Sequence, residues 1–391
     1  MKSRDKITYL DNGATTFPKP PEVIKAYADF CKNIGASPGR GSYEPAEITE
    51  QKINHTREYI SKLIGADDPQ RIVFTKNATE ALNMAIFGIL QKGDKVVTTR
   101  MEHNSVIRPL LELERSGIIE VFWANVTDNG RLDIEHLLEL MEIPDVKLVV
   151  TTGIANSTGV ILPFWQIGEY CRENDIIYLV DGAQLCGVYP VNVLEDNIDM
   201  LAFTGHKGMY GVPGTGGLYV GKKVEKMLKP LLWGGTGGQG DLPSMPDVLP
   251  TKFEAGTPNS PGIIALGEGV QWVIRKSVEA IHQHKQNILS IMLELLRDEK
   301  NIKLFGPKDD MDRTAIVPVV IPGSNPKDIA KSMWNRYNIA VRAGCHCAPH
   351  IHFDLGEPQG TVRFSFGTMN TVEDAEYAAE AIIDIANELK K

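Results

Sequence analysis

The chain has 391 residues, of which 42% are hydrophobic and 23% are charged, and its formal net charge is −9. These values are ordinary for a soluble globular enzyme, and the length suffices for one large domain with a smaller one. The negative charge argues against a nucleic-acid-binding surface, which needs a basic face. No run reaches the ~18 apolar residues that span a bilayer, and the N-terminus lacks a secretory signal. We therefore expect a cytoplasmic protein without a membrane segment.

Strand-like runs alternate with helical patterns through the first two-thirds of the chain. In chain order, the strand and helix pairs are expected at 71–75 and 80–90, at 94–99 and 106–114, and at 147–151 and 163–173. Two further buried-strand patterns follow at 176–180 and 198–203. This alternation predicts a mostly parallel sheet with helices on both faces.

A different pattern begins after a Gly- and Pro-rich stretch at 234–261. A long helical segment is expected near 262–298. The remaining strand candidates and the closing helix lie at 315–321, 339–342, 361–366 and from Thr371 onward. We predict an α/β protein with a large domain over 20–261 and a small α+β domain formed by 1–19 together with 262–391.

Two ionisable residues follow buried-strand patterns. Asp181 ends the run at 176–180, and Lys207 closes the Thr-Gly-His-Lys segment after the run at 198–203. In an open α/β sheet, ligands bind at the carboxyl ends of the strands. A lysine that forms an imine and an aspartate that keeps a ring nitrogen protonated are what a protein supplies to pyridoxal 5′-phosphate (PLP). Either residue alone would be interpreted as a surface charge, so the hypothesis depends on the other residues at this edge.

The start of the 80–90 helix is a candidate phosphate site. Asn77, Ala78 and Thr79 lie between the preceding strand and this helix. Free backbone N–H groups at a helix start bind phosphate, and the hydroxyl of Thr79 adds a donor. A plain helix N-cap is the alternative explanation.

Four further polar side chains follow or lie within predicted strands. His103, Asn156 and Gln184 each stand just past a strand. An imidazole at this position can stack on a cofactor ring, and an amide can form a hydrogen bond with a ring hydroxyl. The alternative is that His103 is an ordinary loop histidine and that Asn156 and Gln184 are turn residues. Arg363 lies inside an apolar strand pattern and needs an anionic partner, which is either a substrate carboxylate or a structural salt bridge.

The segment RAGCHCAPHIH, which begins at Arg342, holds two cysteines and three histidines. Its spacing matches no common zinc pattern, so we predict no metal site. The competing interpretations are a reactive thiolate, favoured by the neighbouring Arg342, His346 and His350, or two inert cysteines in a turn. Cys345 and Cys347 are predicted to share one face of an extended strand end.

Together these motifs resemble the class V aminotransferase family of PLP enzymes, specifically its cysteine desulfurases and selenocysteine lyases. The resemblance covers nearly the whole chain, with motifs in family order: YLDNGATT from Tyr9, NATE from Asn77, HNS from His103, NSTG from Asn156, DGAQ from Asp181, TGHK from Thr204, FEAGTPN from Phe253 and RAGCHCA from Arg342. The short segment before Cys347 is similar to the Suf-type branch. The resemblance implies the PLP-dependent transferase fold-type I and a homodimer.

The resemblance implies one role for each candidate residue. Lys207 would carry PLP as an imine, Cys347 would be the sulfur-accepting nucleophile, and Arg363 would bind the substrate carboxylate with help from Asn156. The other cofactor contacts would be ring contacts from His103, Asp181, Gln184 and Asn156, and phosphate contacts from Ala78, Thr79, Thr204, His206 and, across the dimer, Thr257.

The implied reaction converts L-cysteine to L-alanine and leaves a persulfide on Cys347. The sulfur would pass to an acceptor protein or a small thiol, as in iron–sulfur cluster assembly. Two alternatives stay open: a selenocysteine lyase acting on L-selenocysteine, and a C–S lyase acting on cysteine or cystine, which makes pyruvate and ammonia without Cys347. A non-catalytic sulfur carrier would have no use for the set of Lys207, Asp181 and His103.

Overall fold

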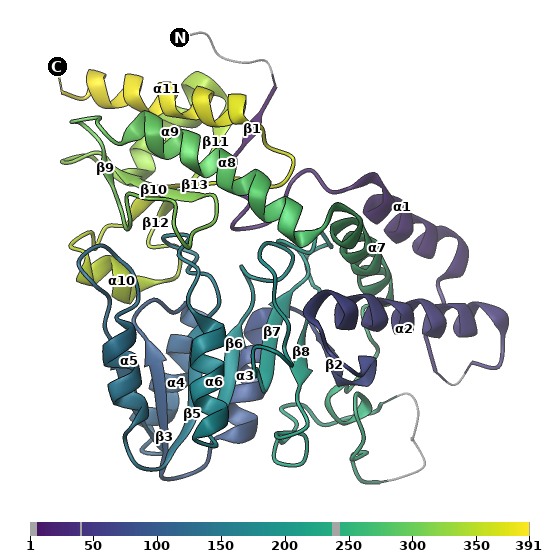
Figure 1. Cartoon of the computed structure of the whole chain (residues 1–391). Coiled ribbons are helices and arrows are strands. Elements are labelled where there is room, and N and C mark those ends of the chain that lie inside the picture. Colours follow the sequence, from purple (N-terminus) through teal and green to yellow (C-terminus); the bar gives the residue numbers. More distant parts are fainter. Residues whose placement is uncertain (1–5, 40, 237–242, 391) are drawn as a thin grey trace.

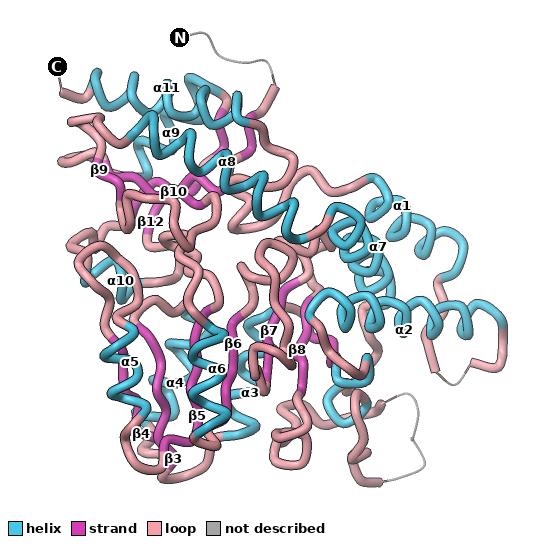
Figure 2. Tube along the Cα trace, in the orientation of Figure 1, coloured by secondary structure: helices cyan, strands magenta, loops and turns pink. Residues whose placement is uncertain are grey.

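The computed structural model describes residues 6–39, 41–236 and 243–390. Its larger part is built on a seven-stranded sheet (Figures 1 and 2). In spatial order the strands are β2 (Ile72–Thr75), β8 (Gly216–Val220), β7 (Met200–Thr204), β6 (Ile177–Asp181), β5 (Val146–Thr152), β3 (Asp94–Thr99) and β4 (Ile119–Ala124). The strands from β7 to β4 are parallel, while β8 runs antiparallel to both of its neighbours. The predicted mostly parallel sheet is confirmed.

Helices cover both faces of this sheet, which explains why its central strands are continuous apolar runs. Along β6, Ile177 and Leu179 pack into one core, and Tyr178 and Val180 pack into the other. Figure 1 shows that helices lie both in front of the sheet and behind it. They are α5 (Ile134–Met141) and α6 (Phe164–Glu173) in front, and α3 (Ala78–Ile89) and α4 (Asn104–Arg115) behind.

A second layer of helices lies beside the β2 and β8 edge (Figure 1). It contains α1 (Pro21–Asp29), α2 (Glu44–Ile64) and α7 (Ser260–Lys276), and both α1 and α2 pack against α7. The prediction of one helical segment at 262–298 is wrong, because α7 ends at Lys276 and α8 (Val278–Leu296) begins after Ser277. Ser277 has a φ of +66° and its side chain caps α8, so it interrupts the helical hydrogen bonding.

The smaller part is a four-stranded antiparallel sheet. Its order is β12 (Arg342–Gly344), β13 (Thr361–Ser365), β10 (Ile316–Val320) and β9 (Lys303–Leu304). Its core includes residues of α8, α9 (Pro326–Tyr337) and α11 (Val372–Glu388). The remaining short elements are β1 (Thr8–Tyr9), β11 (Ile339–Ala340), α10 (Pro349–Asp354) and helical turns at Phe30–Ile34, Pro69–Arg71 and Thr251–Phe253.

The N-terminal segment joins this smaller part, because β1 pairs in parallel with β11 and Leu10 is buried in the same core. The single strand predicted at 339–342 is instead two strands, β11 and β12, in different sheets. Residues Ile263 and Val270 of α7 pack in the core of the large sheet. The division into 20–261 and 1–19 plus 262–391 remains a prediction about folding units.

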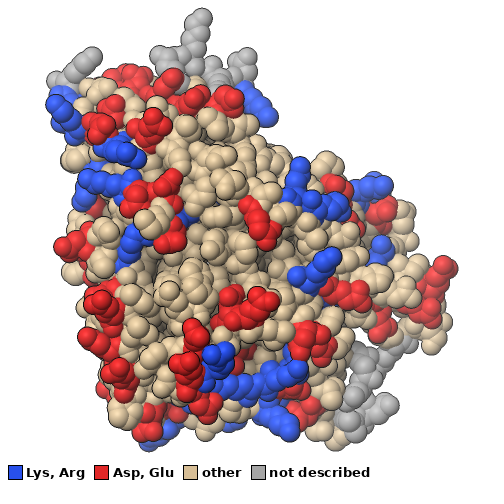
Figure 3. All heavy atoms as spheres, in the orientation of Figure 1, with Lys and Arg blue, Asp and Glu red and all other residues tan. Residues whose placement is uncertain are grey.

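None of the helices among the described residues is long and apolar enough to cross a membrane. On the face shown in Figure 3, acidic and basic side chains are interspersed around a large uncharged area.

Candidate active site

A cavity of about 310 Å³ lies at the carboxyl ends of β3, β5, β6 and β7. This is the edge where ligands bind in open α/β sheets. Eleven of the twelve predicted site residues line it: Ala78, Thr79, His103, Asn156, Asp181, Gln184, Thr204, His206, Lys207, Cys347 and Arg363. The twelfth, Thr257, is exposed and does not line the cavity of its own chain, so its contact across a dimer stays a prediction.

One end of the cavity holds unpaired donors. Asn77 is the N-cap of α3 and accepts the N–H of Glu80 at 3.0 Å, so the predicted capping role is present. Ala78 and Thr79 are the first helical residues, and N–H groups at these positions have no partner within the helix. His206 adds a buried Nδ1 that has no hydrogen-bond partner among the residues that the structure describes. This end of the cavity suits a phosphate group.

His103 is itself a helix cap. Its Nδ1 accepts the backbone N–H of Ser105 at 3.0 Å, and α4 begins at the next residue. Because a backbone N–H can only donate, Nδ1 is unprotonated and the ring proton resides on Nε2. Burial, helped by the charge of Lys207, lowers the pKa of His103 to about 4. The imidazole is therefore neutral at pH 7, with its orientation held by the helix start.

Ser105 is a cavity residue that sequence reasoning missed. Its hydroxyl lies 2.9 Å from Nδ1 of His103 and 2.7 Å from the hydroxyl of Thr79. One side chain thus connects the proposed ring-stacking residue to the proposed phosphate site. Its place directly after His103-Asn104 was the available signal, because the first turn of a helix after a strand faces the same edge.

Asp181 and Lys207 are two ionisable residues that line the cavity. The Asp181 carboxylate is buried, and within the described part of the chain it accepts one hydrogen bond, from the N–H of Ala183 to Oδ1 at 2.9 Å. Burial raises the pKa of Asp181. Lys207 is partly exposed to the cavity, and burial of its amine lowers the pKa to about 8 despite the opposing charge of Asp181. A buried carboxylate with one donor can accept a proton-bearing ring nitrogen.

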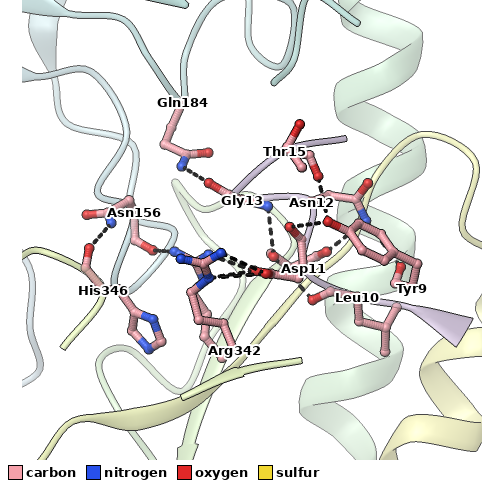
Figure 4. Close-up of polar contacts among 12 residues, drawn as sticks. Tyr9, Leu10, Asp11, Asn12, Gly13, Thr15, Asn156, Gln184, Arg342 and His346 are labelled. Atoms are coloured by element: carbon pink, nitrogen blue, oxygen red, sulfur yellow. Dashed lines mark hydrogen bonds and ion pairs between the residues drawn. The ribbon is translucent and has the colours of Figure 1, made fainter. Parts of the chain in front are cut away.

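Arg363 forms a structural salt bridge and still has donors for a substrate carboxylate, so the two partners that the sequence left open do not exclude each other. It is 2% exposed, its Nη2 donates to Oδ1 of Asp11 at 3.2 Å, and its Nη1 donates to the carbonyl of Asn156 at 3.0 Å. Asp11 also accepts from Nε of Arg342 at 3.1 Å, as Figure 4 shows. A guanidinium has five N–H donors, so Arg363 keeps free donors toward the cavity that it lines. The salt bridge orients Arg363 and leaves it able to bind a carboxylate.

Two amide side chains join distant segments at the cavity wall (Figure 4). Nε2 of Gln184 donates to the carbonyl of Gly13 at 2.8 Å, and Nδ2 of Asn156 donates to the carbonyl of His346 at 2.5 Å. Each amide keeps a second N–H and a carbonyl oxygen for a bound molecule. Their predicted contacts with a cofactor ring stay predictions.

Cys347 stands in a tight turn, so the predicted extended strand end is wrong. β12 ends at Gly344, and the N–H of Ala348 donates to the carbonyl of Cys345 at 2.9 Å. The two residues between them, His346 and Cys347, have φ values of +50° and +60°. Two consecutive left-handed residues define a type I′ turn. Cys347 is exposed and lines the cavity, whereas Cys345 is partly buried.

The histidines near Cys347 do not supply the positive charge expected of them. Burial lowers the pKa of His346 to about 2 and also lowers the pKa of His350, which packs edge-on against Trp123. Both rings are therefore neutral at pH 7, because their ordinary pKa of 6.5 is already below it. Of the three residues predicted to favour a thiolate, Arg342 alone remains charged.

The cysteine and histidine side chains of the RAGCHCAPHIH segment do not gather at one point among the described residues. His352 is fully buried and stacks on Phe305, with ring centres 4.5 Å apart. Within residues 6–39, 41–236 and 243–390, no three His, Cys, Asp or Glu side chains gather in a way that could hold a metal ion.

Glu102 is a buried carboxyl group beside the cavity that sequence reasoning also missed. Its Oε1 accepts from the hydroxyl of Thr99 at 2.6 Å and from the N–H of Thr152 at 2.9 Å, which joins the ends of β3 and β5. Burial raises its pKa to about 8. The carboxyl group is therefore mostly protonated at pH 7.

We expect Glu102→Gln to stabilise the protein at neutral and alkaline pH. In the unfolded chain the carboxyl ionises near its ordinary pKa of 4.5, whereas the folded protein keeps the proton until about 8. Wild-type stability therefore falls as pH rises between these values, by up to about 1.4 kcal/mol per pH unit, and glutamine has no proton to lose. Urea unfolding at several pH values should show the variant's advantage growing over this range. A difference that does not change with pH would show that Glu102 is ionised in the folded protein.

The residues of the cavity fit PLP. Its phosphate would meet the free N–H groups of Ala78 and Thr79 and the unpaired Nδ1 of His206. Its ring nitrogen would meet the Asp181 carboxylate, and its aldehyde would meet the Lys207 amine. The fold and this site define a PLP-dependent enzyme of fold-type I.

The chain belongs to the aminotransferase class V family, whose model matches residues 8–377. It is 34% identical to a probable cysteine desulfurase of Methanothermobacter thermautotrophicus, over 98% of this chain and 95% of that protein. It is 31% identical to a cysteine desulfurase of Haloferax volcanii, over 98% and 90% of the two chains. The apo structure of the cysteine desulfurase from Thermococcus onnurineus NA1 matches with a TM-score of 0.91 at 30% identity, over 98% and 95%. The predicted family and fold class are confirmed.

Proposed function

We propose that the protein is a PLP-dependent cysteine desulfurase, which converts L-cysteine to L-alanine and retains the sulfur as a persulfide on Cys347. The observation that supports this most is that the Cys347 thiol lines the same cavity as Lys207, Asp181 and Arg363. A C–S lyase that makes pyruvate needs no protein thiol at this position. The names of the relatives point to the same reaction.

Arg363 would hold the substrate by its carboxylate. The guanidinium is already oriented by Asp11 and by the carbonyl of Asn156, so little rotational freedom is lost when it binds. Burial lowers the pKa of Arg363 because it disfavours the charged guanidinium. The carboxylate of a bound substrate would offset this penalty, since it adds a negative charge beside the guanidinium. This contact would place the amino group and the thiol of the substrate within the cavity.

Lys207 would move the protons of the reaction. When bound, PLP supplies an electrophilic carbonyl carbon and a ring that accepts electrons. A base is most effective when its pKa lies near the working pH, and the pKa of the Lys207 amine is about 8. Lys207 would remove the α-proton of the substrate and later return a proton to carbon on the way to alanine.

Cys347 would accept the sulfur. Its thiolate attacks the sulfur of the substrate, a sulfur–sulfur bond forms, and the carbon–sulfur bond breaks. The guanidinium of Arg342 also lines the cavity and adds positive charge to the site where the sulfur is transferred. The electron pair of the broken carbon–sulfur bond stays with the substrate, whose carbon atoms then take up protons to give alanine.

The proposal includes a homodimer and a sulfur acceptor. Thr257 is exposed and lies in the segment that resembles the family's phosphate contact from a second subunit. The acceptor would be a protein or a small thiol, with iron–sulfur cluster assembly as one use of the sulfur. We expect the reaction to take place in the cytoplasm.

Product analysis tests the proposed function. Holoenzyme given L-cysteine and a thiol reductant should form alanine and sulfide in equal amounts. Pyruvate and ammonia in amounts equal to sulfide would support the C–S lyase instead. A parallel assay with L-selenocysteine separates the third possibility, because a dedicated selenocysteine lyase would turn over that substrate and leave L-cysteine unchanged.

We expect Asp181→Asn to keep the cofactor and lose turnover by about 10²–10³-fold, the size of effect seen when one group that stabilises developing charge is removed. Asparagine preserves the shape of the side chain but cannot hold a proton on the ring nitrogen. The visible absorbance of the bound cofactor and the rate of alanine formation measure the two effects separately. Near-normal turnover would show that Asp181 has a structural role.

A further inference from the structure

Cys345 is a second thiol beside the proposed persulfide site, and the reaction above does not use it. Cys345 and Cys347 are the first and third residues of the type I′ turn. The residue between them, His346, has a left-handed φ of +50°, which folds the chain tightly and brings Cα atoms two positions apart into roughly the 4.4–6.8 Å range that a disulfide spans. Burial, followed by the charge of Cys347, raises the pKa of Cys345. The charge of the Cys347 thiolate therefore acts on the Cys345 thiol.

The turn is fixed to the cavity wall. The N–H of Asn104 donates to the carbonyl of Cys347 at 2.7 Å, and Nδ2 of Asn156 donates to the carbonyl of His346 at 2.5 Å. The ring Nε2 of His346 lies 3.0 Å from the hydroxyl of Thr361. These bonds tie the turn to three separate segments. A sulfur atom bound to Cys347 therefore has no long mobile loop to bring it to an acceptor outside the cavity.

The backbone at the start of the turn, next to Cys345, is also closely packed. Gly360 has a φ of +87°, and a Cβ atom there would lie 2.1 Å from the carbonyl carbon of Gly344 and 2.6 Å from the nitrogen of Cys345. The segment around Gly360 thus packs directly against the start of the turn. The thiol of Cys345 lies 3.4 Å from the carbonyl of Pro358, outside the set of residues that line the cavity.

We propose that Cys345 is a resolving thiol that releases the sulfur of the Cys347 persulfide as free sulfide, an inference that rests on the proposed function. The Cys345 thiolate attacks Sγ of Cys347. A Cys345–Cys347 disulfide forms, the bond from Sγ of Cys347 to the outer sulfur breaks, and the outer sulfur leaves as hydrosulfide with the electron pair of that bond. The outer sulfur is reduced while the two cysteines are oxidised, so the step balances without an external oxidant.

A thiol reductant completes the cycle. A small dithiol, or two equivalents of a monothiol such as substrate cysteine, reduces the Cys345–Cys347 disulfide and is itself oxidised. Cys345 is adjacent to the persulfide in the same turn, so its effective concentration exceeds that of any free thiol. The acceptor for this enzyme is then a small-molecule thiol that restores the protein, and the sulfur product is sulfide in solution.

A single-turnover experiment tests this step. Reductant-free holoenzyme receives one equivalent of L-cysteine per site, and alanine, sulfide and the masses of the cysteine peptides are followed. Wild type should form one alanine and one sulfide per site and end with a Cys345–Cys347 disulfide. Cys345→Ser should form one alanine, retain the persulfide on Cys347, and release sulfide about tenfold or more slowly. Release by wild type should also accelerate with rising pH, because the attacking species is a thiolate with a raised pKa.

Matched variants separate the possible failures. Cys31→Ser removes an exposed cysteine far along the chain and should behave as wild type. Equal sulfide release by wild type and Cys345→Ser, or a persulfide that persists on wild-type Cys347, would overturn the role of Cys345 while alanine still supports the desulfurase. Absence of alanine from wild type would instead overturn the proposed function itself.

Discussion

Replacement of Lys207 by alanine is expected to abolish covalent retention of the cofactor and to lower alanine formation by at least about 10²–10⁴-fold, the contribution of one positioned acid or base. Lys207 lies after β7 at the carboxyl edge of the sheet, and it lines the cavity together with Asp181. Its amine has a pKa of about 8, so roughly a tenth of it is uncharged and reactive at pH 7, far more than for an ordinary lysine. Borohydride treatment followed by peptide mass analysis should locate the cofactor on Lys207 in the wild type.

Lys222→Ala is the matched control for this experiment. Lys222 is an exposed lysine that pairs with Asp67 on the surface and does not line the cavity. It should retain both the fixed cofactor and full turnover. Cofactor that borohydride still fixes to Lys207→Ala would disprove the assignment of Lys207.

Replacement of Cys347 by serine is expected to remove alanine formation from L-cysteine while leaving the bound cofactor unchanged. Serine fits the same turn, but its hydroxyl is not ionised near neutral pH and does not attack the substrate sulfur. The contacts of the Cys347 backbone with Asn104 should persist, because they use the carbonyl rather than the thiol. Alanine production and cofactor absorbance, measured on one preparation, check both statements.

Cys31→Ser again serves as the control, since this exposed cysteine lies on the turn after α1. Full-rate alanine formation by Cys347→Ser would contradict the proposed transfer of sulfur to this residue. Pyruvate formation by the same variant at the wild-type rate would favour the C–S lyase.

The residues at the strand ends were predictable because a parallel sheet brings the carboxyl ends of its strands to one edge. Asp181 is the last residue of β6, and Lys207 comes three residues after β7 ends at Thr204. His103 and Asn156 follow β3 and β5 in the same way. Hydrophobic runs and the residues that follow them are local features, so they could be recognised without knowledge of the fold.

Long-range pairing and burial could not be predicted in the same way. The contacts of Asp11 with Arg342 and Arg363 join residues more than 300 positions apart, and no local pattern indicates them. The charge expected on His346 depends on burial beneath other segments, which lowers its pKa to about 2. The break at Ser277 and the left-handed turn at Cys347 are backbone conformations set by tertiary contacts, because neither residue type favours a positive φ.

The central claim, that sulfur from L-cysteine is first bound by Cys347, is tested most directly by mass analysis of peptides from holoenzyme briefly exposed to L-cysteine. Rapid alkylation at an early time point would trap the persulfide before Cys345 or an external thiol removes it. We predict one extra sulfur atom on the peptide that contains Cys347, with fragment ions that assign it to Cys347. An extra sulfur located on Cys345 alone, or cysteine consumption with no sulfur added to the protein at any time, would contradict the account.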